Sequence, residues 1–347
     1  MLFKKLLPII AFIFLIWGCG ETERPENSEP ELVTIDTLYQ FMDFENHGIS
    51  RPTALTLMPN GNLAVADRQI QKITIVTPDG DSVAQFGKEG RGPEEFLSPG
   101  QVEVASGMLN VVDISQYKVL EYDFDGNYID SYGFETKAFD RNIALDDDRE
   151  YYSAAAGEDN KLIQWTDTKT DSTFLFGEAK IEEIEEMDIE AARNDIINGR
   201  VPDYFKNNAN VILGESHVYT FLDSYSELRK YDLEGNLIWE KELALPDNEN
   251  LKTDIIEAAK NVPNNLPFLR YTVDVKVIGS DIYLLGGKPS ESPQHLTKIN
   301  EDGMIKAFYK MSDAEMFFGS FTINPENKTI YLSEFMTGKV YKGSLTN

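Results

Sequence analysis

The sequence predicts an all-β protein with the architecture of a β-propeller. Short apolar runs that end in aspartate recur along the chain, and a turn that contains glycine follows each run after 12 or 13 residues. The paired positions are Asp67 and Gly80, Asp113 and Gly126, and Asp223 and Gly235. The first two pairs are offset by 46 residues at both positions. A fixed period of this size, built on short strands and glycine turns, is typical of propellers and related arrays.

The count of strands predicts six blades. Five units of four short strands follow one another at residues 52–86, 101–132, 143–176, 211–243 and 273–309. The third unit is degenerate, whereas the first shows the pattern clearly. Its dipeptides Asn60-Gly61 and Asp79-Gly80 tolerate the positive φ that tight hairpin turns require.

The two ends of the domain predict how the ring closes. The last unit shows three strands, at residues 320–323, 330–333 and 339–342. A further β-prone run, Leu32 to Leu38, precedes the first unit. Pairing this N-terminal strand with the last unit would close the ring and cover an exposed sheet edge. Five blades and one composite blade make six; a seventh is the alternative if an insertion conceals a blade.

Two insertions carry apolar residues at helical spacing. They span Glu178 to Asn198 and Asn248 to Asn261. Each follows an outer strand and precedes the next inner strand, so we expect both on the face where the inner strands begin. Long loops gathered on one face of a rigid scaffold are where binding usually resides. The alternative is that the two helices only cover an apolar blade surface.

The N-terminal residues have the pattern of an export signal. Lys4 and Lys5 precede an apolar run of 12 residues, Leu6 to Trp17. This run is shorter than the roughly 20 residues that cross a bilayer, which favours a secretory signal over an anchor helix. Cys19, the single cysteine, follows at once. No second apolar segment is long enough to cross a membrane.

The stretch Leu15-Ile16-Trp17-Gly18-Cys19 resembles a bacterial lipoprotein signal. The resemblance implies a signal peptide at residues 1–18, lipidation of Cys19, and a membrane partnership through that lipid. An acidic flexible linker at residues 19–31 and a propeller domain at residues 32–347 follow. We therefore expect an outer membrane lipoprotein of the bacterial cell envelope, facing either side. An ordinary secreted protein with an incidental cysteine is the alternative.

One segment carries a family resemblance. Residues 86–99, Phe-Gly-Lys-Glu-Gly-Arg-Gly-Pro-Glu-Glu-Phe-Leu-Ser-Pro, lead into a short strand that ends in Val112-Asp113. This pattern resembles the NHL-repeat propellers of the six-bladed, TolB-like type, and the layout is similar to six-bladed lipoproteins of Bacteroidota. The resemblance implies a binding role for most such families and a lyase, lactonase or esterase activity for a minority.

Composition excludes some partners. The net charge of −27 argues against nucleic acid, because phosphate contacts need clustered Lys and Arg. It argues equally against a helix that adsorbs to anionic lipid.

Several motifs that could carry chemistry instead favour structural roles. Gly87, Gly90 and Gly92 suggest a phosphate loop, but a strand follows them where a helix N-terminus is needed. The repeated aspartates and Glu334 lie at one position of different blades, which favours turn capping over a metal site. The three histidines are His47, His217 and His295, and they do not match the axial histidines of amidating-lyase relatives. The only cysteine lies in the signal and no Gly-x-Ser-x-Gly motif appears. We therefore expect no catalytic residue, no cofactor and no metal.

The residues just before the inner strands form the predicted binding set. They are Arg51, Ser98, Arg141, Asn208, Arg270 and Phe318, and we select the three arginines and Asn208. Guanidinium groups that converge on a channel mouth suit a carboxylate or phosphate; the alternative is that each pairs with a local acid.

The sequence therefore predicts a non-catalytic binding or scaffold protein that holds an anionic small molecule or a partner protein on its loop-rich face. A metal-dependent lactonase or lyase is the competing function, and a subunit of an outer-membrane assembly is a third.

Overall fold

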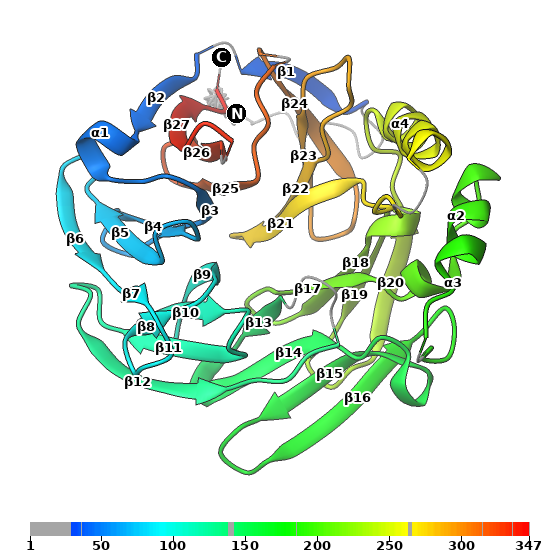
Figure 1. The fold of residues 1–347 in the computed structure, drawn as a ribbon, viewed down its shortest axis with the longest axis horizontal. Helices are drawn as coiled ribbons and strands as arrows, with labels where there is room; N and C mark the ends of the chain where they lie inside the picture. Colours follow the sequence, from blue (N-terminus) through cyan, green and yellow to red (C-terminus); the bar gives the residue numbers. More distant parts are fainter. Residues whose placement is uncertain are drawn as a thin grey trace, which may run out of the picture.

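Six sheets surround a central axis in the computed structural model (Figure 1). The structure describes residues 29–35, 37–137, 142–184, 186–262, 266–313, 315–334 and 336–346. In five of the sheets, four antiparallel strands follow in chain order from the axis outward, and one of these sheets has a fifth strand. The sixth sheet takes its outermost strand from the N-terminal part of the chain. The protein is a six-bladed β-propeller, as the sequence predicts.

The first three blades lie close to their predicted residues. Blade one contains β3 (Pro52–Leu57), β4 (Leu63–Asp67), β5 (Lys72–Val76) and β6 (Ser82–Phe86). Blade two contains β9 (Pro99–Ala105), β10 (Met108–Asp113), β11 (Lys118–Tyr122) and β12 (Tyr128–Gly133), after a small β7 (Lys88–Glu89) and β8 (Glu95–Phe96). Blade three contains β13 (Ile143–Leu145), β14 (Glu150–Ala154), β15 (Lys161–Asp167) and β16 (Ser172–Glu178).

The remaining blades complete the ring. Blade four contains β17 (Ala209–Leu213), β18 (Val218–Leu222), β19 (Glu227–Tyr231) and β20 (Leu237–Glu242). Blade five contains β21 (Thr272–Ile278), β22 (Asp281–Gly286), β23 (His295–Ile299) and β24 (Ile305–Met311). Blade six contains β25 (Ser320–Ile323), β26 (Thr329–Glu334) and β27 (Lys339–Ser344). Each predicted inner strand starts within two residues of the observed one.

Closure of the ring uses two N-terminal strands rather than one. The first, β1 (Glu31–Ile35), pairs in parallel with β24 and becomes the fifth strand of blade five. The second, β2 (Tyr39–Met42), pairs with β27 and completes blade six. An N-terminal strand therefore closes the last blade as predicted, but the predicted residues, Leu32 to Leu38, are wrong: the strand is β2. Burial explains the difference, because Ile35 packs into the apolar cluster between blades five and six, and two open edges are covered where one was expected.

Two of the repeated aspartates, and Glu334 at the equivalent position of blade six, cap turns. Asp67 accepts hydrogen bonds from the backbone N–H groups of Gln69 (2.9 Å) and Ile70 (3.2 Å) in the turn that follows it. It also accepts one from Arg51 (2.9 Å), just before the inner strand. Asp113 and Glu334 cap their own turns in the same way. A single carboxylate thus fastens the start of the inner strand to the end of its neighbour in blade one.

The repeated glycines lie at the contacts between neighbouring blades. Gly126 of blade two has φ +87°, and a Cβ there would lie 2.7 Å from the ring of Phe86 in blade one. Gly235 of blade four has φ +85°, and its Cβ would lie 2.8 Å from Phe176 in blade three. Both the left-handed backbone and the aromatic ring of the preceding blade therefore require glycine.

The helical insertions lie at the outer rim (Figure 1). They form α2 (Ile189–Ile197), α3 (Asp203–Lys206) and α4 (Asn248–Asn261), while a short α1 (Phe44–His47) follows β2. The first insertion becomes helical only at Ile189, because Asp188 caps it there by accepting from the N–H of Ala191 (2.9 Å). Arg193 of α2 donates to the carbonyl of Ala259 in α4 (2.6 Å), which joins the two helices. None of the described residues of α2 or α4 lines the central cavity. Both helices pack against Leu269 and Tyr271, just before β21, so they lie beside the start of this inner strand, on the expected face.

Candidate functional site

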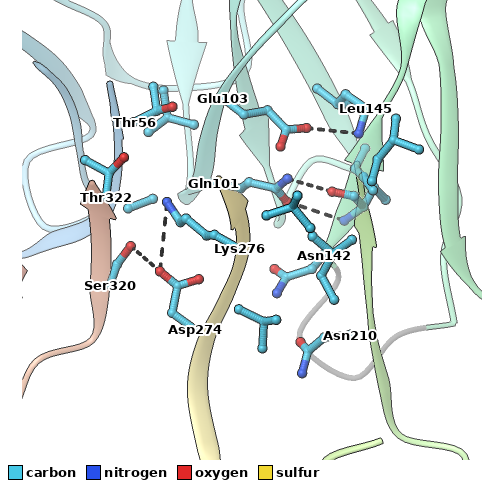
Figure 2. Close-up of a pocket in the computed structure, with 18 of the residues that line it drawn as sticks. Thr56, Gln101, Glu103, Asn142, Leu145, Asn210, Asp274, Lys276, Ser320 and Thr322 are labelled. Carbon is cyan, nitrogen blue, oxygen red and sulfur yellow. Dashed lines mark hydrogen bonds and ion pairs between the residues drawn. The ribbon is translucent and has the colours of Figure 1, made fainter. Parts of the chain in front are cut away.

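A cavity of about 780 Å³ runs along the axis of the propeller. All six inner strands contribute to its wall. Figure 2 labels polar residues in the middle part of this wall. They are Thr56, Gln101, Glu103, Asn142, Asn210, Asp274, Lys276, Ser320 and Thr322. None of the described residues that line the cavity is aromatic.

The two ends of the cavity carry opposite charge. Arg68 and Arg270 line the end where the inner strands begin. Asp146, Asp147 and Glu215 line the other end, after β13 and β17 have finished. Because all six inner strands run in the same direction, these groups lie at opposite mouths. An electrostatic gradient therefore runs along the axis and favours a negative group at the arginine end.

Of the predicted binding residues, Arg270 is the one that the structure places in the wall of the cavity. Its Nε lies 3.6 Å from Oδ2 of Asp223, an ion pair of the kind expected if each arginine finds a local acid. The flanking Leu269 and Tyr271 are buried in the apolar cluster of α2, α3 and α4. The helices thus hold the segment that presents Arg270, although they do not reach the cavity themselves.

Asp223, which the sequence predicts as a turn cap, joins neighbouring blades through its side chain. Its carboxylate accepts hydrogen bonds from Asn210 Nδ2 (2.9 Å) and from the hydroxyl and N–H groups of Thr272. It is buried and connects blade four to the first residue of the next inner strand. Here the repeated aspartate fastens neighbouring blades together and orients one channel-facing amide.

The structure does not place the other predicted binding residues, Arg51, Asn208 and Arg141, in the wall of the cavity. Arg51 and Asn208 lie directly before β3 and β17, as predicted, but they are not among the residues of the cavity wall. Arg141 lies outside the described residues. Arg68 is a further residue of the arginine end that was not predicted from the sequence, and its backbone N–H donates to the carbonyl of Arg51 (3.2 Å). The sequence repeat could have identified Arg68. It directly follows the repeated Asp67, as Ile114 directly follows Asp113, and both Arg68 and Ile114 line the cavity.

Glu103 is the acidic group of the channel interior. The N–H of Leu145 donates to its Oε1 at 3.0 Å (Figure 2). Burial raises the pKa of Glu103 to about 7, although hydrogen bonds from Leu145 and Gln101 and the charge of Lys276 act in the opposite direction. The carboxyl group is enclosed by protein yet accessible from the cavity, and among the described residues it forms no ion pair.

Lys276 and Asp274 form the second charged group of the interior. Lys276 Nζ donates to the carbonyl of Leu55 in blade one and lies 3.9 Å from Asp274 Oδ2. That same oxygen accepts from Ser320 Oγ (2.7 Å) and from the N–H of Phe321 (3.1 Å). Asp274 is therefore largely satisfied by blade six, and Lys276 keeps donor capacity toward the channel.

The glycine loop after blade one supplies its own anion. Glu95 Oε2 accepts from the N–H of Gly92 at 2.7 Å, and Lys88 lies 3.1 Å from the same carboxylate. The hydrogen bond from Gly92 holds the pKa of Glu95 below its usual value. A carboxylate of the chain thus occupies the donor that a phosphate would need.

The histidines serve local structure in separate blades. His47 contacts the carbonyl of Gly80 at 2.9 Å, and His217 contacts the hydroxyl of Ser216 at 2.9 Å. His295 lies 2.7 Å from Asp247, and burial lowers the pKa of His295. Within the described part of the chain, no three His, Cys, Asp or Glu residues come together as a metal site.

Comparison with known proteins supports the architecture. Residues 49–212 match the DUF5128 family model, which is described as a 6-bladed beta-propeller. No curated protein matches the sequence.

Among solved structures, a putative exported protein from Bacteroides fragilis is 11% identical, with a TM-score of 0.55 over 90% of this chain and 98% of that one. A DUF4221 member from Bacteroides vulgatus is also 11% identical, with a TM-score of 0.54 over 89% and 96%. Catalytically inactive virginiamycin B lyase from Staphylococcus aureus, crystallised with quinupristin, is 11% identical, with a TM-score of 0.50 over 89% and 99%. At this identity the likeness concerns the fold alone.

Proposed function

We propose that this chain is a non-catalytic binding protein that takes a small polar ligand into its central channel. One observation carries the proposal: a cavity of about 780 Å³ is bounded by all six inner strands and lined by polar and charged side chains. Ligand sites commonly have volumes of about 300–1,000 Å³ and hold a few well-placed polar groups.

The way in which these groups are held favours recognition. Gln101 donates to the carbonyl of Ile143 (2.6 Å) and accepts from its N–H (3.4 Å), which joins blades two and three. Asn210 is held by Asp223, and Asp274 by blade six. Side chains that are oriented by the scaffold lose little freedom when a ligand binds, and this preorganisation increases affinity.

The arginine end would attract and orient the ligand. Arg68 and Arg270 line that mouth, and in the sequence the predicted partners Arg51 and Arg141 precede the inner strands of blades one and three. An anionic group on the ligand suits guanidinium groups. This part of the proposal fails if simultaneous Arg51→Ala, Arg141→Ala and Arg270→Ala substitutions leave the ligand response unchanged.

We extend the proposal to the cell envelope. Cys19 would carry lipid, and the acidic residues after it would separate the propeller from the membrane, as a lipoprotein of the NHL, TolB-like type. None of the described helices is long and apolar enough to cross a membrane. Partition of the expressed chain into detergent, lost in Cys19→Ala, tests the anchor.

A channel-filling variant tests the binding site. A thermal-shift screen of the full chain against a polar metabolite library identifies ligands. Thr322→Trp and Thr56→Trp each place an indole in the channel and should abolish the shift. Thr173→Trp, at an exposed position of β16, is the matched control. A ligand response that survives both channel variants, or conversion of the ligand to product, overturns the proposal.

A further inference from the structure

We infer that the ligand of the channel is a small zwitterion of the amino-acid class, with its ammonium group on Glu103 and its carboxylate on Lys276. The inference rests on the proposed function and names the chemistry that this site would select.

Glu103 and Lys276 occupy the same height in the channel. Each pairs with the residue three positions before the end of the second strand of its blade: Glu103 with Asn110, where β10 ends at Asp113, and Lys276 with Tyr283, where β22 ends at Gly286. Both inner strands also carry the same register shift at their first residues. The two side chains are therefore structurally equivalent positions of different blades.

The two residues also face each other. Glu103 belongs to blade two and Lys276 to blade five, which lie three places apart in a ring of six and so on opposite walls (Figure 1). In blades one and six the equivalent positions hold Thr56 and Thr322, which pair with Ala64 and Tyr331. At this height of the channel, Glu103 and Lys276 therefore lie on opposite sides of the axis, and the hydroxyl groups of the two threonines lie between them on one side.

Neither charge is fully compensated by the protein. Glu103 accepts hydrogen bonds from the N–H of Leu145 and from Gln101, but it forms no ion pair among the described residues. Lys276 lies 3.9 Å from Asp274, a carboxylate that already accepts two shorter hydrogen bonds from blade six. An enclosed carboxyl group without a cation is destabilised in its charged form, and an ammonium ligand would relieve this.

A zwitterion satisfies both walls at once. A simple anion would leave Glu103 without a cation, and a simple cation would meet the charge of Lys276. Burying a charge is costly unless it is paired and hydrogen-bonded. Planar ring ligands are disfavoured, because the described wall offers no aromatic ring for stacking. The arginine end would draw the carboxylate inward first.

A charge-separation series tests the inference. The probes are glycine, β-alanine, γ-aminobutyrate and 6-aminohexanoate, with acetate and methylamine as singly charged controls, titrated calorimetrically into the full chain. We expect at least one zwitterion to bind about tenfold more tightly than either control, as two charged hydrogen bonds imply. Glu103→Gln should weaken that zwitterion about tenfold while it leaves acetate unchanged. Lys276→Met should weaken both the zwitterion and acetate.

Matched variants separate recognition from folding. Glu326→Gln changes an exposed glutamate of a loop and should leave every titration unchanged. Glu103→Gln keeps an oxygen that can accept from the N–H of Leu145, so we expect the variant to fold normally. Circular dichroism checks this. Equal binding of zwitterions and controls, or unchanged affinity in Glu103→Gln, overturns the inference. If no probe binds but a library compound does, and Thr322→Trp blocks it, the inference fails while the binding function stands. If no response depends on the channel, both fail.

Discussion

The rim and the channel of this propeller use the repeat in opposite ways. At the rim, equivalent positions hold equivalent residues: Gly126 and Gly235 each lie against an aromatic ring of the preceding blade. In the channel, equivalent positions differ, since blades two and five hold Glu103 and Lys276 at one height while blades one and six hold threonine. Residues that repeat build the scaffold, and residues that break the repeat at a shared height define the candidate site.

The strongest test of the rim is Gly126→Val. A Cβ at Gly126 would lie 2.7 Å from Phe86 and the backbone has φ +87°, so we expect a loss of about 4 kcal/mol in the free energy of unfolding. Gly107→Ala is the control, because that glycine has φ +70° with nothing within 4 Å and should lose only about 1 kcal/mol. Denaturant titration measures both, and equal losses would contradict the blade contact.

The capping aspartates should rank next. Asp113→Ala removes the acceptor of N–H groups from Leu97 (2.6 Å) and Ser115 (3.0 Å), and we expect a loss of about 3 kcal/mol because these donors remain unpaired. Asp81→Ala, at an exposed turn, should stay within about 0.5 kcal/mol of the parent. A loss at Asp113 no larger than at Asp81 would show that the cap is dispensable.

The channel should respond in the opposite direction. Because the pKa of Glu103 is raised from 4.5 to about 7 in the folded chain, the parent loses stability as the pH rises through that interval. Glu103→Gln remains neutral, so at pH 8 it should be more stable than the parent by about 2 kcal/mol. Lys276 and Tyr132 are the ionisable groups whose charge couples to Glu103.

Denaturant titrations at pH 4.5 and pH 8 measure this gain. The difference between Glu103→Gln and the parent should shrink toward pH 4.5, where both side chains are neutral. If Glu103→Gln is less stable than the parent at both pH values, the Glu103 side chain stabilises the fold and the prediction is wrong.

The smallest effect should arise at the mouth. Arg68→Ala removes one positive group from the end of the cavity and should slow association of an anionic or zwitterionic ligand by about two- to threefold at low salt. Stopped-flow measurements at two ionic strengths check this. The effect should vanish at high salt; a change that persists there would indicate a direct contact instead of attraction.

Much of the fold could be predicted from local signals. The starts of the inner strands follow from short apolar runs and Asp-Gly turns, whose chemistry acts within a few residues. The closing segment could not be assigned this way, because β1 and β2 are both β-prone and only the open edges of β24 and β27 decide between them. The first insertion is predicted to be helical from Glu178, but Glu178 is the last residue of β16 and the helix α2 begins only at Ile189.

The candidate site was less predictable. Arg270 was identified from its place before an inner strand, whereas Arg68, Glu103 and Lys276 were missed. Glu103 and Lys276 are 173 residues apart in the chain, and each looks like a polar residue of an ordinary alternating strand. Aligning the inner strands of the blades on the repeat would have identified Glu103 and Lys276 as equivalent positions with opposite charge.

The sequence by itself determined the blade and its repetition, because hairpin turns, strand alternation and glycine positions depend on near neighbours along the chain. Only the tertiary structure decided which strands cover the open edges and which side chains face one another across the axis. Those relations depend on ring closure, which brings blade two opposite blade five and places an acid and a base at the same height of one channel.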